Sequence, residues 1–452
     1  MTQKTEATPV DLLVLGAGNA GLGAAGVARE AGWTVRIVES RDVGGTCALR
    51  GCVPKKVLVA AAEALDVIRR AGSHHIDVGE VSLDWGALIA RERTFVEGVP
   101  EQFEASLERR GIELVRGAAR FVGPNEVEVD GVVHRAKKIV VATGSAPRVL
   151  PIEGFEHALT SDDLLQHTEL PESIAFVGGG VIGLELGHVM ARAGAKVTIL
   201  EAAPRLLPRH DEDQVAELAR VTESIGIDVH ASVRVQRIEP LDGRFRVHFE
   251  KDGEAQTLVV HAVANAAGRA PNLDLNLEAA GISFDGRSLA LDGFRSTENQ
   301  NVFFAGDAVP GRPQLSPIAS VEGRAVGRSL VSESLEDVHY DDVPSVVFTV
   351  PAIARVGLTE AEAKAAGLSF QAKVNDMRTW RSAKSYGEEA AWAKVLVEDE
   401  TGRILGAHLV GHGGAETIHA FAAAITEGKT ASDLKSRVYA YPTFHSDLKY
   451  LV

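Results

Sequence analysis

The feature that most constrains the fold is a unit of strand, glycine-rich turn, helix, strand and acidic residue that occurs twice in the chain. In the first copy, the apolar run 10–15 leads into the turn and the second strand ends at Glu39. In the second copy, the run 174–177 leads into the turn and the second strand ends at Glu201. Short apolar runs of this kind are typical of buried parallel strands. The sequence therefore predicts an α/β protein with two Rossmann-like domains.

The glycine spacing of the two turns predicts two dinucleotide sites. Glycines let backbone amides approach a pyrophosphate at a helix N-terminus, and the acid at the end of the second strand is placed to accept a ribose hydroxyl. In both copies this acid lies 23 residues after the first glycine. Two sites indicate two nucleotides, most simply a flavin dinucleotide and a nicotinamide dinucleotide. The residues concerned are Gly16, Gly18, Gly21 and Glu39 in the first copy, and Gly178, Gly180, Gly183 and Glu201 in the second.

The chain has only two cysteines, Cys47 and Cys52, and both lie in one segment with glycines and lysines around them. Cationic neighbours and helix N-termini favour the reactive thiolate, whereas a zinc site usually needs four ligands. A redox-active disulfide is favoured over two buried, inert thiols, and no metal site is expected. Five helical residues rise about 7.5 Å, while bridged Cα atoms usually lie within about 6.8 Å. We therefore expect a helix that is distorted between the two cysteines, with Gly51 making the distortion easier.

Composition limits the possible partners and location. The net charge of −15 argues against nucleic acid or an anionic membrane as a partner. No apolar run reaches the length of about 18 residues that a membrane-spanning helix needs. The N-terminus is polar, without a signal core, so a cytoplasmic location is expected. Disorder is expected only in the first eight residues, and the charge run 211–213 is expected to be a solvated helix start.

Between and after the two units, the pattern predicts a helical stretch at 57–110, hairpin strands at 112–133, a β-rich stretch at 229–260 with turns at the Asp-Gly pairs 242–243 and 252–253, and a separate C-terminal α+β domain from about residue 340. With the cysteine segment and three short motifs, these features resemble the flavin-dependent pyridine nucleotide-disulfide oxidoreductases, the group of glutathione reductase, dihydrolipoamide dehydrogenase and mercuric reductase. The motifs are residues 44–55, Ala-Thr-Gly at 142–144, Gly-Arg-Ala-Pro-Asn at 268–272 and Ala-Gly-Asp at 305–307. The resemblance covers essentially the whole chain.

The resemblance implies an arrangement of domains, cofactors and partners. It implies an FAD-binding domain at 1–146 and 270–338, an NAD(P)-binding domain at 147–269 and a dimerisation domain at 339–452. The protein is then a homodimeric NAD(P)H-dependent flavoprotein disulfide reductase that acts on a small-molecule electron acceptor and serves cell redox homeostasis. NADH is favoured because Glu201 repels the extra phosphate of NADPH. NADPH stays possible through Arg205 and Arg209, although a solvated surface is the expected role of these two arginines.

The resemblance also implies roles for single residues. Cys52 faces the flavin, Cys47 attacks the substrate, and Lys55, paired with Glu185, lies at the flavin ring. Asp307 holds the ribityl chain. Further nucleotide contacts are implied for Gly45, Thr46, Lys56, Thr143, Gly144, Gly268, Arg269 and Gly306.

The C-terminus departs from the family pattern. Family members carry His-Pro-Thr-x-x-Glu, whose histidine exchanges protons with the thiols of the partner subunit, but here Tyr441 and Ser446 occupy the His and Glu positions. Three interpretations stay open. His445 and Asp447 form a displaced pair, Tyr441 donates the proton, or the acceptor needs no acid catalyst because it is a quinone, a metal ion or a disulfide with an acidic leaving thiol. A flavin-based redox sensor is the alternative to an enzyme.

Overall fold

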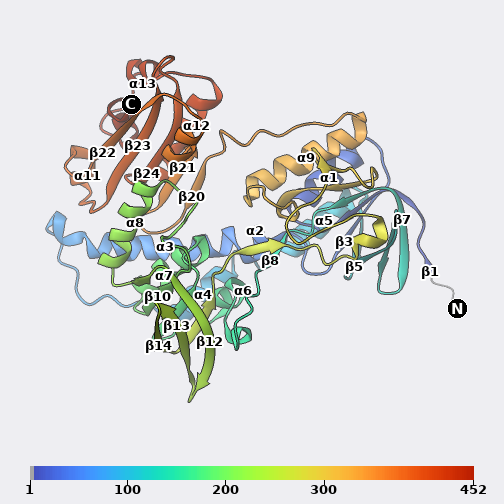
Figure 1. Cartoon of the computed structure of the whole chain (residues 1–452), viewed down its shortest axis with the longest axis horizontal. Coiled ribbons are helices and arrows are strands. Elements are labelled where there is room, and N and C mark those ends of the chain that lie inside the picture. Colours follow the sequence, from blue (N-terminus) through green and yellow to red (C-terminus); the bar gives the residue numbers. More distant parts are fainter. Residues whose placement is uncertain (1–4) are drawn as a thin grey trace. The chain divides into compact units, whose positions relative to one another are not determined.

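The chain divides into two compact units in a computed structural model that describes residues 5–452. The first unit holds the residues up to Pro54, Glu92–Arg148 and Arg269–His339. The second holds Lys55–Arg91, Val149–Gly268 and Tyr340–Val452. Figure 1 shows the elements of both units in sequence colours. The domain boundaries inferred from the sequence stay predictions.

The first unit is built on a ten-stranded sheet whose parallel part has the order β19-β7-β2-β3-β4. Helices α1 and α9 pack against each other along their length (Figure 1). The apolar run predicted as the first strand is buried at the centre of this sheet. The elements are β1 (Thr5–Glu6), β2 (Val10–Leu15), α1 (Asn19–Glu30), β3 (Val35–Glu39), α2 (Gly45–Arg50), α5 (Val99–Arg109), β4 (Glu113–Arg116), β5 (Ala119–Gly123), β6 (Glu126–Val129), β7 (Val132–Val141), β17 (Leu291–Asp292), β18 (Arg295–Ser296), β19 (Val302–Phe304) and α9 (Ser316–Ser332). A separate two-stranded ribbon joins β8 (Ser145–Pro147) to β16 (Arg269–Pro271).

The expectation of disorder over the first eight residues is wrong for part of that segment. Residues 1–4 lie outside the described residues. Thr5–Glu6 form β1, which pairs in parallel with β7 at Val132 and Val133. The partner strand therefore orders a segment whose own sequence has no apolar pattern.

The second unit contains the second nucleotide-binding fold. Its parallel sheet has the order β11-β10-β9-β15, and a three-stranded antiparallel sheet joins β12, β13 and β14. The turns between these three strands contain the predicted Asp-Gly pairs, at 242–243 and 252–253. The elements are α3 (Cys52–Arg69), α4 (Trp85–Arg93), α6 (Ser161–Gln166), β9 (Ser173–Val177), α7 (Val181–Ala193), β10 (Lys196–Leu200), α8 (Glu212–Ser224), β11 (Asp228–His230), β12 (Val233–Leu241), β13 (Arg244–Lys251), β14 (Glu254–Val260) and β15 (Ala262–Asn265). The start of α3 and the last two residues of α4 belong to the first unit.

The C-terminal part of the second unit is a five-stranded antiparallel sheet of order β20-β21-β24-β23-β22, with α12 packed on β21 and β24 (Figure 1). The predicted fold class, two Rossmann-like regions and a C-terminal α+β region, is confirmed. The elements are β20 (Ser345–Val347), β21 (Ile353–Gly357), α10 (Glu360–Ala365), β22 (Phe370–Asp376), α11 (Arg381–Ser385), β23 (Ala391–Glu398), β24 (Ile404–Gly411), α12 (Gly414–Thr426), α13 (Ala431–Ser436), the 3₁₀ turn η5 (Phe444–Asp447) and α14 (Leu448–Leu451). Among residues 5–452, no helix combines the length and apolarity needed to cross a membrane.

The charge run at 211–213 is the helix start that the sequence suggested, with Glu212 and Asp213 exposed, but Asp211 is not solvated. Asp211 caps α8 through the amides of Asp213 and Gln214 and is almost completely buried. The ammonium of Lys394, which is 2% exposed, lies 2.9 Å from an Asp211 oxygen and 2.5 Å from an Asp213 oxygen. Buried charges need such partners because desolvation penalises an isolated ion. The carboxylates therefore attach α8 to β23 of the C-terminal sheet.

Candidate active site

The two cysteines lie on consecutive helices that are interrupted at the predicted residue. Cys47 is in the first turn of α2 and is half-buried, and Cys52 is the exposed first residue of α3. Gly51 separates the helices with φ −148° and ψ −109°, outside the helical region. The predicted distortion between the cysteines is confirmed. Because a helix N-terminus favours negative charge, the position of Cys52 suits a thiolate.

The cysteine segment begins against the first nucleotide-binding turn. The Gly44 amide donates to the Ala17 carbonyl over 3.0 Å. Gly45 has φ +72°, and a Cβ added there would lie 2.7 Å from the Cα of Gly18. A larger residue at 45 would therefore push the cysteine segment away from this turn.

The first turn fits a dinucleotide. A Cβ at Gly21 would lie 1.9 Å from the Gly16 carbonyl oxygen, so the turn closes only with glycine at position 21. The two carboxylate oxygens of Glu39 accept hydrogen bonds from the amides of Ala17, over 2.7 Å, and Arg41, over 2.8 Å. The acid is thereby fixed at the end of β3, where it is placed to accept a ribose hydroxyl. This geometry fits the adenosine part of FAD.

The second turn repeats the first. A Cβ at Gly183 would lie 2.4 Å from the Gly178 carbonyl oxygen. The carboxylate of Glu201 accepts from the amides of Gly179, over 2.5 Å, and Ala203, over 2.6 Å. Both acids are therefore held by the glycine turn and by the residue two positions further on. The second site fits a nicotinamide dinucleotide in the same way.

Asp307, predicted to hold the flavin ribityl chain, is largely buried in the first unit. Burial raises the pKa of Asp307 above its ordinary value, although the Ser145 hydroxyl, which donates to it over 3.0 Å, opposes this shift. Arg269 donates from Nε to the same hydroxyl over 2.9 Å and from Nη2 to the Ser145 carbonyl over 2.5 Å. Arg269, predicted as a nucleotide contact, thus also orients the hydroxyl beside Asp307.

The remaining predicted nucleotide contacts lie in loops. The hydroxyl of Thr143 donates to the Asn272 carbonyl over 2.6 Å. Gly144, Gly268 and Gly306 all have positive φ. Thr46 lies in the first turn of α2, and the ammonium of Lys56 pairs with Glu63 over 2.9 Å at the surface. These observations leave their cofactor roles as predictions.

Lys55 and Glu185 form the pair that the resemblance implied. Their side chains are 15% and 8% exposed, and Lys55 Nζ lies 2.5 Å from Glu185 Oε1. The same oxygen accepts from the Phe348 amide over 2.8 Å. The ammonium also lies 4.3 Å from the centroid of the Phe348 ring, within cation–π range. Phe348, which sequence reasoning did not single out as a site residue, therefore holds this pair from the C-terminal part of the chain.

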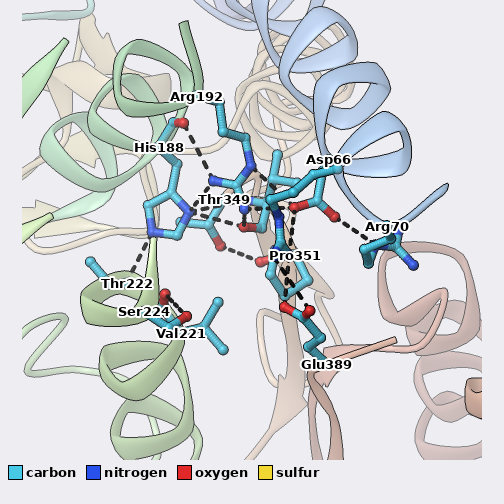
Figure 2. Close-up of polar contacts among 12 residues, drawn as sticks. Asp66, Arg70, His188, Arg192, Val221, Thr222, Ser224, Thr349, Pro351 and Glu389 are labelled. Carbon is cyan, nitrogen blue, oxygen red and sulfur yellow. Dashed lines mark hydrogen bonds and ion pairs between the residues drawn. The ribbon is translucent and has the colours of Figure 1, made fainter. Parts of the chain in front are cut away.

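A second polar cluster holds the segment that follows Phe348, as Figure 2 shows. Arg192 Nη2 donates to the Val350 carbonyl over 2.5 Å and lies 3.1 Å from Asp66. His188 contacts the same carbonyl and the Thr222 hydroxyl. Complete burial, assisted by the charge of Arg192, lowers the pKa of His188 to about 3. A neutral His188 and a charged Arg192 together fix the backbone beside Phe348.

The C-terminal segment does not form the displaced His445–Asp447 pair. The imidazole of His445 stacks at 5.8 Å from the Tyr439 ring, and burial lowers the pKa of His445. Asp447 Oδ2 instead accepts from Ser382 and lies 2.8 Å from His412 Nε2. That interpretation was wrong because η5 turns Asp447 toward α11 and β24. Ser446, at the family's glutamate position, donates its hydroxyl to the Thr443 carbonyl over 2.6 Å.

Tyr441 is 69% exposed and lines a pocket of about 940 Å³. The walls come from α11, η5, α14 and the residues beside them, and they carry aromatic and polar side chains. The lining residues include Trp380, Arg381, Ser382, Tyr386, Phe444 and Tyr450. Asp447 also faces this pocket. His412 and Ser382 were missed from the sequence, where the only signal was a histidine among glycines after an apolar strand.

Comparison with known proteins identifies the family. Residues 10–323 match the family model described as pyridine nucleotide-disulphide oxidoreductase, and residues 343–452 match the dimerisation domain of that family. The chain is 32% identical over 450 residues to dihydrolipoyl dehydrogenase of Bacillus subtilis (strain 168), covering 97% of this chain and 96% of the relative. It is 32% identical over 435 residues to glutathione reductase of Burkholderia cepacia, covering 96% of each. The chain belongs to the pyridine nucleotide-disulphide oxidoreductase family.

Among solved structures, the Cu(II) complex of the HOCl-induced flavoprotein disulfide reductase RclA from Escherichia coli superposes with a TM-score of 0.88. The identity is 28%, and the match covers 98% of this chain and 99% of RclA. The predicted class is confirmed: the protein is an NAD(P)H-dependent flavoprotein disulfide reductase that uses FAD and a pyridine nucleotide. The dimerisation domain supports a homodimer.

Proposed function

We propose that this enzyme passes electrons from NADH to the Cys47–Cys52 pair and on to a small-molecule disulfide. Cys52 receives the electrons on the flavin side, and Cys47 attacks the acceptor. FAD, when bound, supplies the hydride acceptance and the onward electron transfer that protein side chains lack. The observation that carries the proposal is the contact between the cysteine segment and the first nucleotide turn, where Gly45 meets Gly18. A cytoplasmic location is part of the proposal, since two cysteines in a reducing compartment favour redox chemistry over a structural disulfide.

Lys55 is the cation of this site. Glu185 and the Phe348 ring hold its ammonium from two sides, so that little side-chain freedom remains. A fixed cation stabilises negative charge that develops near it, and more strongly where water is excluded. We assign Lys55 to the stabilisation of the reduced flavin and Glu185 to the positioning of Lys55.

Two observations favour NADH over NADPH. The carboxylate of Glu201 is fixed by two backbone amides at the position of a ribose-binding acid. The guanidinium of Arg205 donates to the carbonyls of Leu207, Pro208 and His210, over 3.2, 2.8 and 3.0 Å. Arg205 therefore closes its own loop, which leaves it poorly placed to answer a phosphate. Arg205 is partly exposed, and its contacts within the loop come in addition to the surface role expected from the sequence.

The acceptor site is proposed to form in the homodimer. The segment around Tyr441 in one subunit then meets the cysteine pair of the partner, with Tyr441 in the place of the family's histidine. A cysteine-independent metal-ion reductase is the second candidate, because the RclA structure that this chain resembles is a Cu(II) complex.

The test is an acceptor assay on the FAD-loaded dimer with NADH. Disulfides, lipoamide, quinones and Cu(II) serve as acceptors for the wild type and for Cys47→Ser and Cys52→Ser. We expect NADH-dependent disulfide reduction that both substitutions abolish while FAD binding is kept. Unchanged turnover of Cu(II) in Cys47→Ser, together with no disulfide turnover in the wild type, would establish the second candidate, whereas unchanged turnover of a quinone alone would contradict both candidates. The absence of turnover with every acceptor would favour a redox sensor.

A further inference from the structure

A buried histidine, His412, lies beneath the aromatic pocket of the C-terminal domain. It follows β24 and precedes α12 (Figure 1), and 5% of its surface is exposed. Its Nδ1 lies 2.9 Å from Glu388 Oε2, and its Nε2 lies 2.8 Å from Asp447 Oδ2. The Ser382 hydroxyl lies 3.3 Å from the same Nε2 and donates to Asp447. These four residues, 382, 388, 412 and 447, are named the His412 network.

The geometry favours a protonated imidazole. A carboxylate accepts hydrogen bonds, and the two ring nitrogens of histidine are both donors only in the imidazolium form. Burial alone lowers the pKa of His412, but the hydrogen bonds with Glu388 and Asp447 outweigh it and hold the pKa above its ordinary value. Among the described residues, Glu388 and Asp447 are the charged groups whose contacts with His412 set this balance. Glu388 comes from the segment between α11 and β23, and Asp447 from η5.

The His412 network reaches the pocket through two of its members. Ser382 and Asp447 line the pocket, His412 contacts both of them, and Glu388 lines a separate pocket. Phe444 covers His412, with ring centroids 4.5 Å apart, and also forms part of the wall. Arg381, which precedes Ser382 on α11, is the cation among the lining residues. A proton on His412 therefore has a hydrogen-bonded route to the pocket through the Ser382 hydroxyl.

We propose that the His412 network is the proton source of the acceptor pocket and takes over the task of the missing His-Glu pair. His412 stores the proton and is a positioning residue, while Ser382 delivers the proton to the bound acceptor. The inference rests on the proposed function, because the pocket must receive a disulfide whose reduction consumes protons.

The step balances as follows. The thiolate of Cys47 of the partner subunit attacks one sulfur of the acceptor disulfide, the acceptor S–S bond breaks, and the other half leaves as a thiolate. This thiolate takes the Ser382 hydroxyl proton while His412 Nε2 returns a proton to Ser382. Cys52 then attacks the Cys47 sulfur, which re-forms the Cys47–Cys52 disulfide and releases the second half, protonated by the same route after His412 has regained a proton from solvent. The electron pair comes from the nicotinamide nucleotide.

The other candidates in the C-terminal segment are less suited to this task. Tyr441 is 69% exposed, so the surrounding protein does little to fix its hydroxyl against a bound acceptor. His445 has its pKa lowered by burial and stacks on Tyr439 instead of contacting a carboxylate. Among the histidines of residues 5–452, only His412 combines a carboxylate on each ring nitrogen with a hydroxyl that lines the pocket.

The test compares two disulfides that differ in leaving group. Bis(2-hydroxyethyl) disulfide releases an alkyl thiol that needs a proton, whereas 5,5′-dithiobis(2-nitrobenzoate) releases an acidic thiol that departs as the thiolate. Removing a positioned acid typically costs about 100-fold or more. We expect His412→Gln to slow reduction of the alkyl disulfide about 100-fold and that of the aromatic disulfide less than about threefold. The fall of the wild-type rate with the alkyl disulfide as pH rises should be absent in the variant.

Three further variants guard against misfolding and nonspecific effects. Ser382→Ala leaves the His412 carboxylate pairs in place and should reproduce the selective loss, while Ser382→Thr should restore the rate. His419→Gln, at an exposed position on α12, should change neither rate. Equal losses with both disulfides, or no loss with either, in both His412→Gln and Ser382→Ala would refute the network while leaving the proposed function intact. Wild-type turnover of both disulfides by Cys47→Ser would refute the proposed function itself.

Discussion

Replacing Glu201 by glutamine should weaken the preference for NADH over NADPH. Two unit charges about 4 Å apart interact by about 1 kcal/mol in water and about 4 kcal/mol near a protein surface. Since each 1.36 kcal/mol is tenfold, the carboxylate contributes between about fivefold and about 1000-fold to discrimination against the extra phosphate. Glu201→Gln removes this charge with almost no change of shape, so the ratio of kcat/KM for NADPH to that for NADH should rise at least about fivefold.

The ratio is the informative quantity because glutamine also disturbs the turn. The amides of Gly179 and Ala203 each donate to one Glu201 oxygen, and a glutamine has only one oxygen to offer. The unsatisfied amide costs about 1–3 kcal/mol, which should weaken both coenzymes equally and cancel in the ratio. Steady-state kinetics with each coenzyme at a fixed acceptor concentration measures the ratio of the two kcat/KM values.

Glu39 provides the matched control. Its carboxylate accepts from Ala17 and Arg41 in the same pattern, but at the first site. Glu39→Gln should therefore lower FAD affinity, measured by retention of bound flavin, and leave the coenzyme ratio unchanged. A wild type that prefers NADPH, or a Glu201→Gln ratio equal to that of the wild type, would refute the electrostatic argument.

Three other changes test separate parts of the structure. Lys394→Met should lower stability by about 3–5 kcal/mol, seen as an earlier midpoint of chemical unfolding, because Asp211 stays buried without its ammonium partner; a midpoint within experimental error of the wild type would contradict this. Gly18→Ala and Gly180→Ala should fold, because φ is negative at both positions and the nearest atoms to an added Cβ lie at 3.7 and 3.9 Å. Gly18→Ala should nevertheless lose FAD, and Gly180→Ala should raise the KM for NADH. The stability advantage of the wild type over His412→Gln should be complete below about pH 6.5 and should shrink as pH rises through the raised pKa of His412. Thermal unfolding at several pH values measures this advantage, and an advantage that grows with pH would contradict the raised pKa.

The parts of the site that follow from local sequence were predicted well. The glycine spacing and the acid at the end of the second strand lie within one strand–helix–strand unit, and the helix break at Gly51 follows from the distance between two cysteines in a helix. The pairing of Lys55 with Glu185 was implied by family resemblance and is present. Each of these features depends on a few residues or on a pattern shared by many sequences.

The sequence by itself determined two nucleotide-binding turns, the cysteine pair and the absence of the usual C-terminal histidine. Tertiary structure alone decided what stands near these groups: His412 meets Asp447 across 35 positions, and Phe348 meets Glu185 across 163. Neither contact has a local signal, because the first forms when η5 packs beside β24 and the second when the segment around Phe348 packs on α7. From the sequence, the neighbouring His445 was the expected partner of Asp447. The turn η5 instead directs Asp447 toward His412, which is distant in the sequence. Hydrogen bonds depend on ångström distances between separate elements. For this reason the sequence indicated the proposed electron route through the cysteine pair, but not the proposed proton source, the His412 network.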